Sequence, residues 1–486
     1  MLSFSFARSA LSLLIALASP AALLAQAPLQ QRVEAQLAQA GAGTRFGLLV
    51  AAEDGREIIA IAPDGRFIPA SNTKIFTTAA AFHTLGGLAA PDREGGAAVR
   101  LGEGEIPDVF LIGNGDARLS SAPDCVTNCL AALADAVAAR TKRVGNVIGD
   151  DSLFPDQRWS PGMSWNNIPT RSGTATSALT LDDNEIIVRV LPGAPGQPPR
   201  LEHGGYYTID NRAVTVGQGP AALAFDRTPG SFLLRLSGTL AAGAEPETLR
   251  LAIDDPAHHA AWRFKQMLEE RGVRVTGEVQ AQHRSVQTYD DPARRRGAPP
   301  PRAPRAEPLA KLVPPPLAAD VVTINKISQN LHAELLLRRV GLANGTGSLA
   351  DGLAAVEAMV LEAGVPGDRV DLSDGSGMST YNRLTPRGVA AFLTWVQRQP
   401  WGAAWRETLA VGGVDGTLAR RFKGTALEGK VFAKTGGLNA TTALSGYLIA
   451  SSGRTLTFSA FANDIPEGAA AATAIDAALL AVAAEN

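Results

Sequence analysis

Three small groups of polar residues could carry out nucleophilic catalysis in this 486-residue chain. In the first group, Ser71 and Lys74 stand three positions apart, a spacing that places two side chains on one face of a helix and within reach of proton transfer. A serine hydroxyl is a weak nucleophile until a base takes its proton, and a neutral lysine amine can be that base. Taken alone, Ser71 is also typical of an ordinary helix N-cap.

The other two groups lie far along the chain. Ser328 and Asn330 flank a glutamine, where a hydroxyl can relay a proton to a leaving amine and an amide can hold a substrate backbone. Lys434, Thr435 and Gly436 end a predicted strand, whose edge can pair with an extended peptide while the lysine and threonine meet its terminal carboxylate. The plainer interpretations are a capped helix start and an exposed strand end.

A lysine that acts as a base near neutral pH needs a lowered pKa, because its usual value is about 10.4. A second ammonium group nearby has that effect, and we expect Lys434 to provide it for Lys74. Each group alone is common by chance. The three groups in this order predict acyl transfer through a serine.

The elements that must position these groups come from both ends of the chain. Asp54-Gly55 is typical of a hairpin turn, and Ser71 stands at the start of an Ala-rich apolar helix. Strands from both ends of a chain can pair into one sheet, with the terminal helices covering one face. We predict helices at 32–39, 72–85, 331–340 and 468–484, and strands at 45–53, 56–62, 430–434, 442–450 and 455–462.

More than 200 residues with a different sequence pattern separate these two ends of the chain. Their short β-rich runs predict a mainly β inserted region of one or two small domains, with a solvated Pro/Arg-rich loop at 294–316. The fold class is therefore α+β, with an antiparallel sheet covered by helices and split by a large insertion. Within the insertion we predict strands at 185–191, 232–240, 248–253 and 273–279, and a helix at 257–271.

Composition and targeting signals narrow the function further. The 45 Lys and Arg residues nearly balance the 47 Asp and Glu residues, for a formal net charge of -2. The chain therefore lacks the excess positive charge that attracts nucleic acid. Residues 1–27 predict a cleaved secretory signal, and their apolar run of about 15 residues is short for a membrane anchor. Outside the cytoplasm, Cys125 and Cys129 favour a local disulfide over two free thiols, and they lack the further ligands of a zinc site. We expect no metal or cofactor, and no membrane span after signal cleavage.

The three groups in this order resemble the signature of penicillin-binding proteins and class A β-lactamases. The wider sequence resembles the low-molecular-mass class C penicillin-binding proteins, the D-alanyl-D-alanine carboxypeptidase/endopeptidases. The long interval between Ser71 and Ser328 fits that family, whose transpeptidase-like domain is split by an insertion, whereas a class A β-lactamase has these motifs closer together. The matching segments are 69–74, 111–116, 149–152, 325–334, 374–377, 382–384 and 413–418.

The resemblance implies a role for each residue. Ser71 would be the acylated nucleophile, Lys74 its general base, and Ser328, Asn330 and Lys434 the rest of the proton network. The backbone N–H groups of Ser71 and Gly437 would form an oxyanion hole, and Thr435 and Gly436 would bind the substrate. The catalytic domain would span 28–90 and 311–486, and the inserted region 91–310.

The substrates implied are peptidoglycan stem peptides in the periplasm, with β-lactams as inhibitors. Two departures from the family stand out. Gly437 follows K-T-G where a threonine is common, and Asn166 and Asn167 occupy positions where relatives often carry an acid that meets a diamino acid side chain. The alternatives are a β-lactamase or esterase with the same acyl-serine chemistry, and a non-catalytic wall-binding protein.

Overall fold

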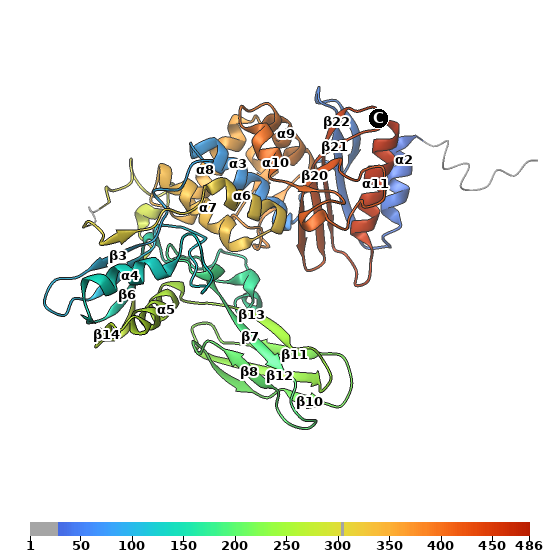
Figure 1. Ribbon diagram of the computed structural model, residues 1–486. Helices are drawn as coiled ribbons and strands as arrows, with labels where there is room; N and C mark the ends of the chain where they lie inside the picture. Colours follow the sequence, from blue (N-terminus) through green and yellow to red (C-terminus); the bar gives the residue numbers. More distant parts are fainter. Residues whose placement is uncertain (1–27, 303–305) are drawn as a thin grey trace, which may run out of the picture.

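The computed structural model describes residues 28–302 and 306–486, so the predicted signal segment 1–27 lies outside the described residues. One six-stranded antiparallel sheet joins both ends of the chain (Figure 1), in the order β19-β20-β21-β22-β1-β2. This pairing of N-terminal with C-terminal strands confirms the predicted arrangement. The strands are β1 (Arg45–Ala51), β2 (Glu57–Ile61), β19 (Ala410–Val411), β20 (Val431–Leu438), β21 (Thr441–Ile449) and β22 (Thr455–Asn463).

Helices cover both faces of this sheet. α2 (Leu29–Ala38) and α11 (Ala471–Glu485) lie on one face, where Val33 and Leu479 join a core with the strand residues Leu448 and Phe458. A helical layer covers the other face: α3 (Lys74–Thr84), α6 (Leu317–Val322), α7 (Asn330–Ala343), α8 (Leu349–Glu362), α9 (Pro386–Gln397) and α10 (Gly402–Glu407). The short 3-10 turn η1 (Ala70–Thr73) contacts both β20 and β21, so it lies at the seam between the sheet and the helical layer.

The inserted region begins with a five-stranded sheet in the order β15-β6-β4-β3-β16. Its strands β4, β6 and β15 run parallel, and parallel neighbours need crossover connections that helices usually supply. Here α4 and α5 supply them. The bounds are β3 (Ala98–Leu101), β4 (Val109–Ile112), α4 (Leu130–Arg140), β5 (Arg143–Val144), β6 (Val147–Pro155), α5 (Pro256–Glu270), β14 (Arg274–Val275), β15 (Val279–Arg284) and β16 (Ala310–Lys311).

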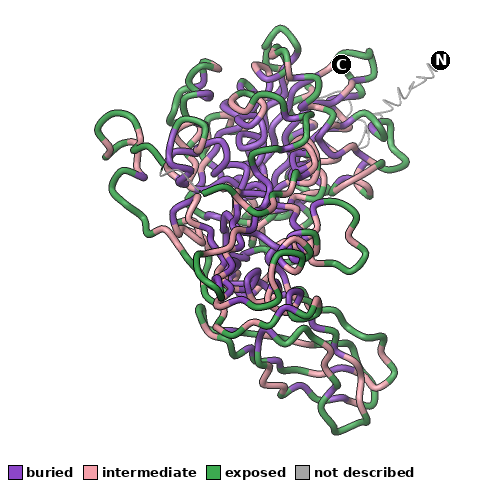
Figure 2. Tube along the Cα trace, turned by 60° about the vertical axis from the view of Figure 1, so that its left-hand side comes forward, coloured by how far each residue is buried: buried purple, intermediate pink, exposed green. Residues whose placement is uncertain are grey.

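The rest of the insertion is a β-rich part that extends away from the body of the molecule (Figure 1). Its residues are mostly exposed or half-buried (Figure 2), around a small core that includes Val188, Leu234 and Leu236. It contains β7 (Glu185–Leu191), β8 (Arg200–His203), β9 (Thr208–Asn211), β10 (Val214–Val216), β11 (Ala222–Asp226), β12 (Leu233–Ala241) and β13 (Glu247–Ala252).

Several local expectations needed correction. The single strand predicted at 273–279 is two strands, β14 and β15, interrupted where Gly277 packs closely against Asn146. The Pro/Arg-rich segment is not a loop throughout, because β16 pairs with β3. Helix α4 was not foreseen. The predicted disulfide is confirmed between Cys125 and Cys129, directly before α4.

No helix among the described residues combines the length and apolar character needed to cross a membrane. The division of the chain into a catalytic domain (28–90 and 311–486) and an inserted region (91–310) stays a prediction.

Candidate active site

Ser71 lies in a turn that a second segment holds in place. The preceding residue, Ala70, has a φ of 48°, in the left-handed region that a non-glycine residue rarely adopts. Gly377 packs against it so closely that an added Cβ would lie 1.9 Å from the Ala70 carbonyl oxygen. Such backbone strain persists only where the surroundings enforce it. The peptide that precedes Ser71 is therefore fixed by direct backbone contact.

Lys74 begins α3 with its side chain fully buried. Its Nζ lies 2.9 Å from Ser71 Oγ, 2.7 Å from Asn330 Oδ1 and 2.5 Å from the Ser376 carbonyl oxygen. The amide and carbonyl oxygens can only accept hydrogen bonds. A neutral amine would donate its two N–H groups to them and point its lone pair at the hydroxyl of Ser71, which is the geometry that a base requires.

Burial is the main reason why Lys74 can lose its proton. Desolvation lowers its pKa to about 7, against an opposing effect from the charges of Asp374 and Glu334. We expected the ammonium of Lys434 to lower the pKa of Lys74, whereas burial is the main cause. The pKa of Lys434 is itself held well below its usual value, first by burial and then by the charge of Lys74.

Lys434, on β20, belongs to a second set of contacts. Its Nζ lies 2.9 Å from Ser328 Oγ and 3.1 Å from the Thr435 carbonyl oxygen. Ser328 follows the π-turn Thr323–Ile327 and has a φ of 66°, so the left-handed backbone brings its hydroxyl to Lys434. Thr435 Oγ1 lies 2.8 Å from Thr417 Oγ1.

Strand β20 is fastened to the Ser71 turn at two points. The Asn72 amide donates a 2.9 Å hydrogen bond to the Lys434 carbonyl. A Cβ on Gly436 would lie 2.5 Å from the Pro69 carbonyl oxygen, so only glycine allows this approach, whereas a Cβ on Gly437 would meet nothing within 4 Å. The two lysines are buried, while the side chains of Ser71, Ser328, Asn330 and Thr435 remain partly accessible. The structure thus gathers all the predicted side chains at one seam.

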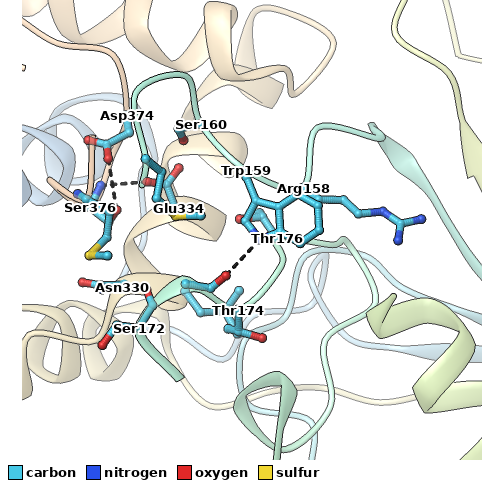
Figure 3. Close-up of a pocket in the computed structure, with 14 residues that line it drawn as sticks. Arg158, Trp159, Ser160, Ser172, Thr174, Thr176, Asn330, Glu334, Asp374 and Ser376 are labelled. Carbon is cyan, nitrogen blue, oxygen red and sulfur yellow. Dashed lines mark hydrogen bonds between the residues drawn. The ribbon is translucent and has the colours of Figure 1, made fainter. Parts of the chain in front are cut away.

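Sequence reasoning missed three contributors to this site. Asp374, Ser376 and Glu334 all lie in segments that match the family, 374–377 and 325–334, but none of them was assigned a role. The D-G-S-G pattern was the available signal, because closely spaced glycines mark a place where backbones approach each other. Figure 3 shows Glu334 and Asp374 pointing toward Ser376.

A small cavity lies beside these residues, between the inserted region and the helical layer (Figure 3). The Asn330 amide donates a 2.9 Å hydrogen bond to the Ser172 carbonyl across this junction, which fixes the direction of its Oδ1 toward Lys74. Trp165–Asn167 adjoins this wall but does not line the cavity. The lining residues are Arg158, Trp159, Ser160, Met163, Ser172, Gly173, Thr174, Thr176, Asn330, Leu331, Glu334, Asp374, Ser376 and Met378.

The fold as a whole matches penicillin-binding protein structures. The crystal structure of penicillin binding protein 4 (dacB) from Haemophilus influenzae superposes with a TM-score of 0.77 over 92% of this chain and 98% of that chain, at 21% sequence identity. The fold is therefore the α+β fold of penicillin binding protein 4.

Sequence comparison identifies the family. The chain belongs to the D-Ala-D-Ala carboxypeptidase 3 (S13) family, whose pattern matches residues 29–486. It is 34% identical to the D-alanyl-D-alanine carboxypeptidase of Actinomadura sp. (strain R39), over 81% of this chain and 73% of that protein. It is 25% identical to D-alanyl-D-alanine carboxypeptidase DacB of Haemophilus influenzae, over 88% and 87%. The resemblance seen in the sequence is confirmed, and the chain is a hydrolase of the peptidase class.

Proposed function

We propose that this protein is a serine-type D-alanyl-D-alanine carboxypeptidase that acts on peptidoglycan stem peptides through an acyl-enzyme at Ser71. The observation that carries the proposal is the setting of Lys74. Its buried amine lies 2.9 Å from Ser71 Oγ, and Asn330 and Ser376 occupy its two other hydrogen-bonding directions. A non-catalytic binding protein would have no need of a buried amine with a pKa near 7 beside a serine.

Acylation begins when neutral Lys74 takes the Ser71 proton. Ser71 Oγ attacks the carbonyl carbon of the penultimate D-alanine, and the negative charge that develops on its oxygen is held by the backbone N–H groups of Ser71 and Gly437. Donors of this kind contribute roughly 3 kcal/mol each in comparable enzymes. The C–N bond then breaks as the leaving D-alanine amine takes up the proton that Lys74 accepted, relayed through Lys434 and Ser328, so that Lys74 is neutral again. In the second step Lys74 takes a proton from the water that attacks the ester carbonyl carbon and returns it to Ser71 Oγ as the ester bond breaks.

The substrate lies along β20 in this proposal. β19 pairs with Phe432 and Ala433, so among the described residues no neighbouring strand covers this edge of β20 beyond them. An extended peptide can add to such an edge through main-chain hydrogen bonds. Its terminal carboxylate would then meet Thr435, next to the Ser71 turn. Gly437 retains the backbone donor but offers no second hydroxyl for the carboxylate.

The same chemistry leads to three finer proposals. The enzyme also cuts D,D-cross-links as an endopeptidase, because a cross-link presents the same acyl group with a different leaving amine. β-Lactams acylate Ser71 and inhibit the enzyme. It is exported through the signal at residues 1–27 and works in the periplasm. In support, one solved structure of Haemophilus influenzae penicillin binding protein 4 is described as a complex with a β-lactam.

Intact-protein mass spectrometry tests the proposal. Incubation with penicillin should add one stoichiometric, long-lived adduct, and digestion of pentapeptide and cross-linked muropeptides should release D-alanine and monomers. Ser71→Ala should abolish the adduct and the release, and Ser120→Ala, in the inserted region, serves as the control. Labelling that persists in Ser71→Ala would identify another nucleophile. Rapid turnover of penicillin without lasting adduct would favour a β-lactamase.

A further inference from the structure

The loop 374–379 contacts both members of the Ser71 and Lys74 pair. The Ser376 carbonyl accepts the 2.5 Å hydrogen bond from Lys74 Nζ. Gly377, with a φ of 86°, packs on the Ala70 carbonyl. One short loop therefore sets the direction of the amine and supports the turn that carries the hydroxyl.

Two buried carboxylates hold this loop. Glu334 Oε1, from α7, accepts hydrogen bonds from the backbone N–H groups of Gly375 (3.0 Å) and Ser376 (2.9 Å). Asp374 accepts from the N–H groups of Gly377 (2.8 Å) and Ser379 (2.6 Å). Charge-assisted hydrogen bonds of this kind are about twice as strong as neutral ones.

The contacts of Glu334 form an unbroken chain to the nucleophile. Its Oε2 accepts a 2.8 Å hydrogen bond from Arg338, and its Oε1 holds the N–H group of Ser376. The Ser376 carbonyl in turn holds Lys74, which lies 2.9 Å from Ser71 Oγ. No side chain of the loop lies between Glu334 and the base, because the link runs through the peptide groups.

We infer that Glu334 is a positioning residue for the base: it holds the backbone of Ser376 so that the carbonyl oxygen orients the Lys74 amine toward Ser71. The inference rests on the proposed function, in which Lys74 takes the Ser71 proton. Alignment matters because a displacement of about 1 Å at a reacting group can cost on the order of 100-fold in rate. Glu334 itself touches neither the substrate nor the reacting atoms.

Two substitutions of Glu334 can distinguish the effect of its oxygen position from the effect of its charge. Arg338 faces Glu334 from α7, Lys74 from α3 and Asp374 from the loop, while Arg158 of the inserted region lines the same cavity. A glutamine keeps an oxygen that accepts both N–H groups but loses the charge. It would leave buried Arg338 without its anion, so Glu334→Gln is combined with Arg338→Met. An aspartate keeps the charge but withdraws the oxygen by one bond length.

The experiment compares acylation rates by fluorescent penicillin in wild type, E334Q/R338M, E334D and the control E357Q, whose residue is exposed on α8. We expect E334Q/R338M to stay within about threefold of wild type and E334D to slow by about 100-fold. In E334Q/R338M the half-maximal pH of acylation should fall slightly below that of wild type, because the Glu334 charge raises the pKa of Lys74 and the simultaneous loss of the Arg338 charge offsets part of that change.

Other outcomes would overturn the inference. E334D faster than E334Q/R338M would show that charge, and not position, is what Glu334 supplies. If E334Q/R338M and E334D acylated equally slowly, or both at the wild-type rate, Glu334 would not act by positioning Lys74. If the wild-type protein formed no adduct at Ser71, the proposed function itself would be wrong. The series of hydrogen bonds from Glu334 through Ser376 to Lys74 would then be a structural feature only.

Discussion

The two lysines of the site have the same side chain and the same complete burial, but their surroundings differ. Lys74 lies within hydrogen-bond distance of three groups, and the charges of two buried acids, Asp374 and Glu334, raise its pKa. Lys434 meets one hydroxyl and one carbonyl, and no carboxylate has a resolved effect on its pKa.

This difference separates two effects on a buried amine. Burial lowers the pKa of both lysines, because desolvation penalises the charged form. The acids beneath Lys74 bring its pKa back to about 7, where the amine can take and return a proton in each turnover. No acid among the described residues raises the pKa of Lys434 in the same way. This difference supports the proposal that Lys74 is the base and that Lys434 has a supporting role in proton transfer.

The largest expected effect comes from removing each lysine in turn. Lys74→Ala should slow acylation by about 10⁴-fold and Lys434→Ala by about 10²-fold, the upper and lower ends of the range for general acid–base groups. Single-turnover kinetics with fluorescent penicillin would measure both, with circular dichroism to verify folding. A larger loss in Lys434→Ala would reverse the assignment.

A second prediction concerns the backbone contact on the Lys74 side. Gly377→Ala should reduce the acylation rate by about 100-fold, because its Cβ would collide with the Ala70 carbonyl and shift the Ser71 turn. Gly367→Ala is the matched control, because its Cβ would have open space and the residue lies outside the site, at the start of the 3-10 turn Gly367–Arg369. Full activity in Gly377→Ala would mean that the turn tolerates movement.

The pH dependence of the rate tests the pKa of Lys74, with a smaller expected effect. In the proposed mechanism the neutral form of Lys74 is active, so kcat/KM for a D-Ala-D-Ala peptide should be half-maximal near pH 7 and fall tenfold for each pH unit below it. Above pH 7 this group should no longer limit the rate. Stopped-flow or discontinuous assays between pH 5 and pH 9 would measure the profile, and a rate that rises as the pH falls would contradict a neutral base.

The smallest effect is expected on the Lys434 side, at Thr435. Thr435→Val keeps the shape but removes one hydroxyl, and one hydrogen bond contributes about 0.5 to 1.5 kcal/mol. We expect kcat/KM for peptide substrates to fall by about 10-fold or less, mainly through KM. Thr417→Val, which removes the hydrogen-bond partner of Thr435, should have a still smaller effect. A loss as large as that of Lys434→Ala would give Thr435 a direct part in catalysis.

Much of the fold could be predicted because its signals are local. The hairpin at Asp54-Gly55, the helix after Ser71 and the closing strands follow from turn residues and apolar periodicity. Helix α4 was within reach of the same rules and was overlooked, because its buried residues Leu130, Leu133, Ala134 and Val137 follow the helical spacing. The break between β14 and β15 could not be predicted in this way, because it depends on the contact between Gly277 and Asn146.

Residue types and their spacing show directly which chemical groups are present and in what order, so the sequence was enough to indicate the family. The lowered pKa of Lys74 could be explained only from the folded chain. The two acids and the Ser376 carbonyl that surround Lys74 belong to α7 and to a loop, about 260 to 300 residues from Lys74 along the chain. A pKa depends on what surrounds a group in space, and not on its neighbours along the chain.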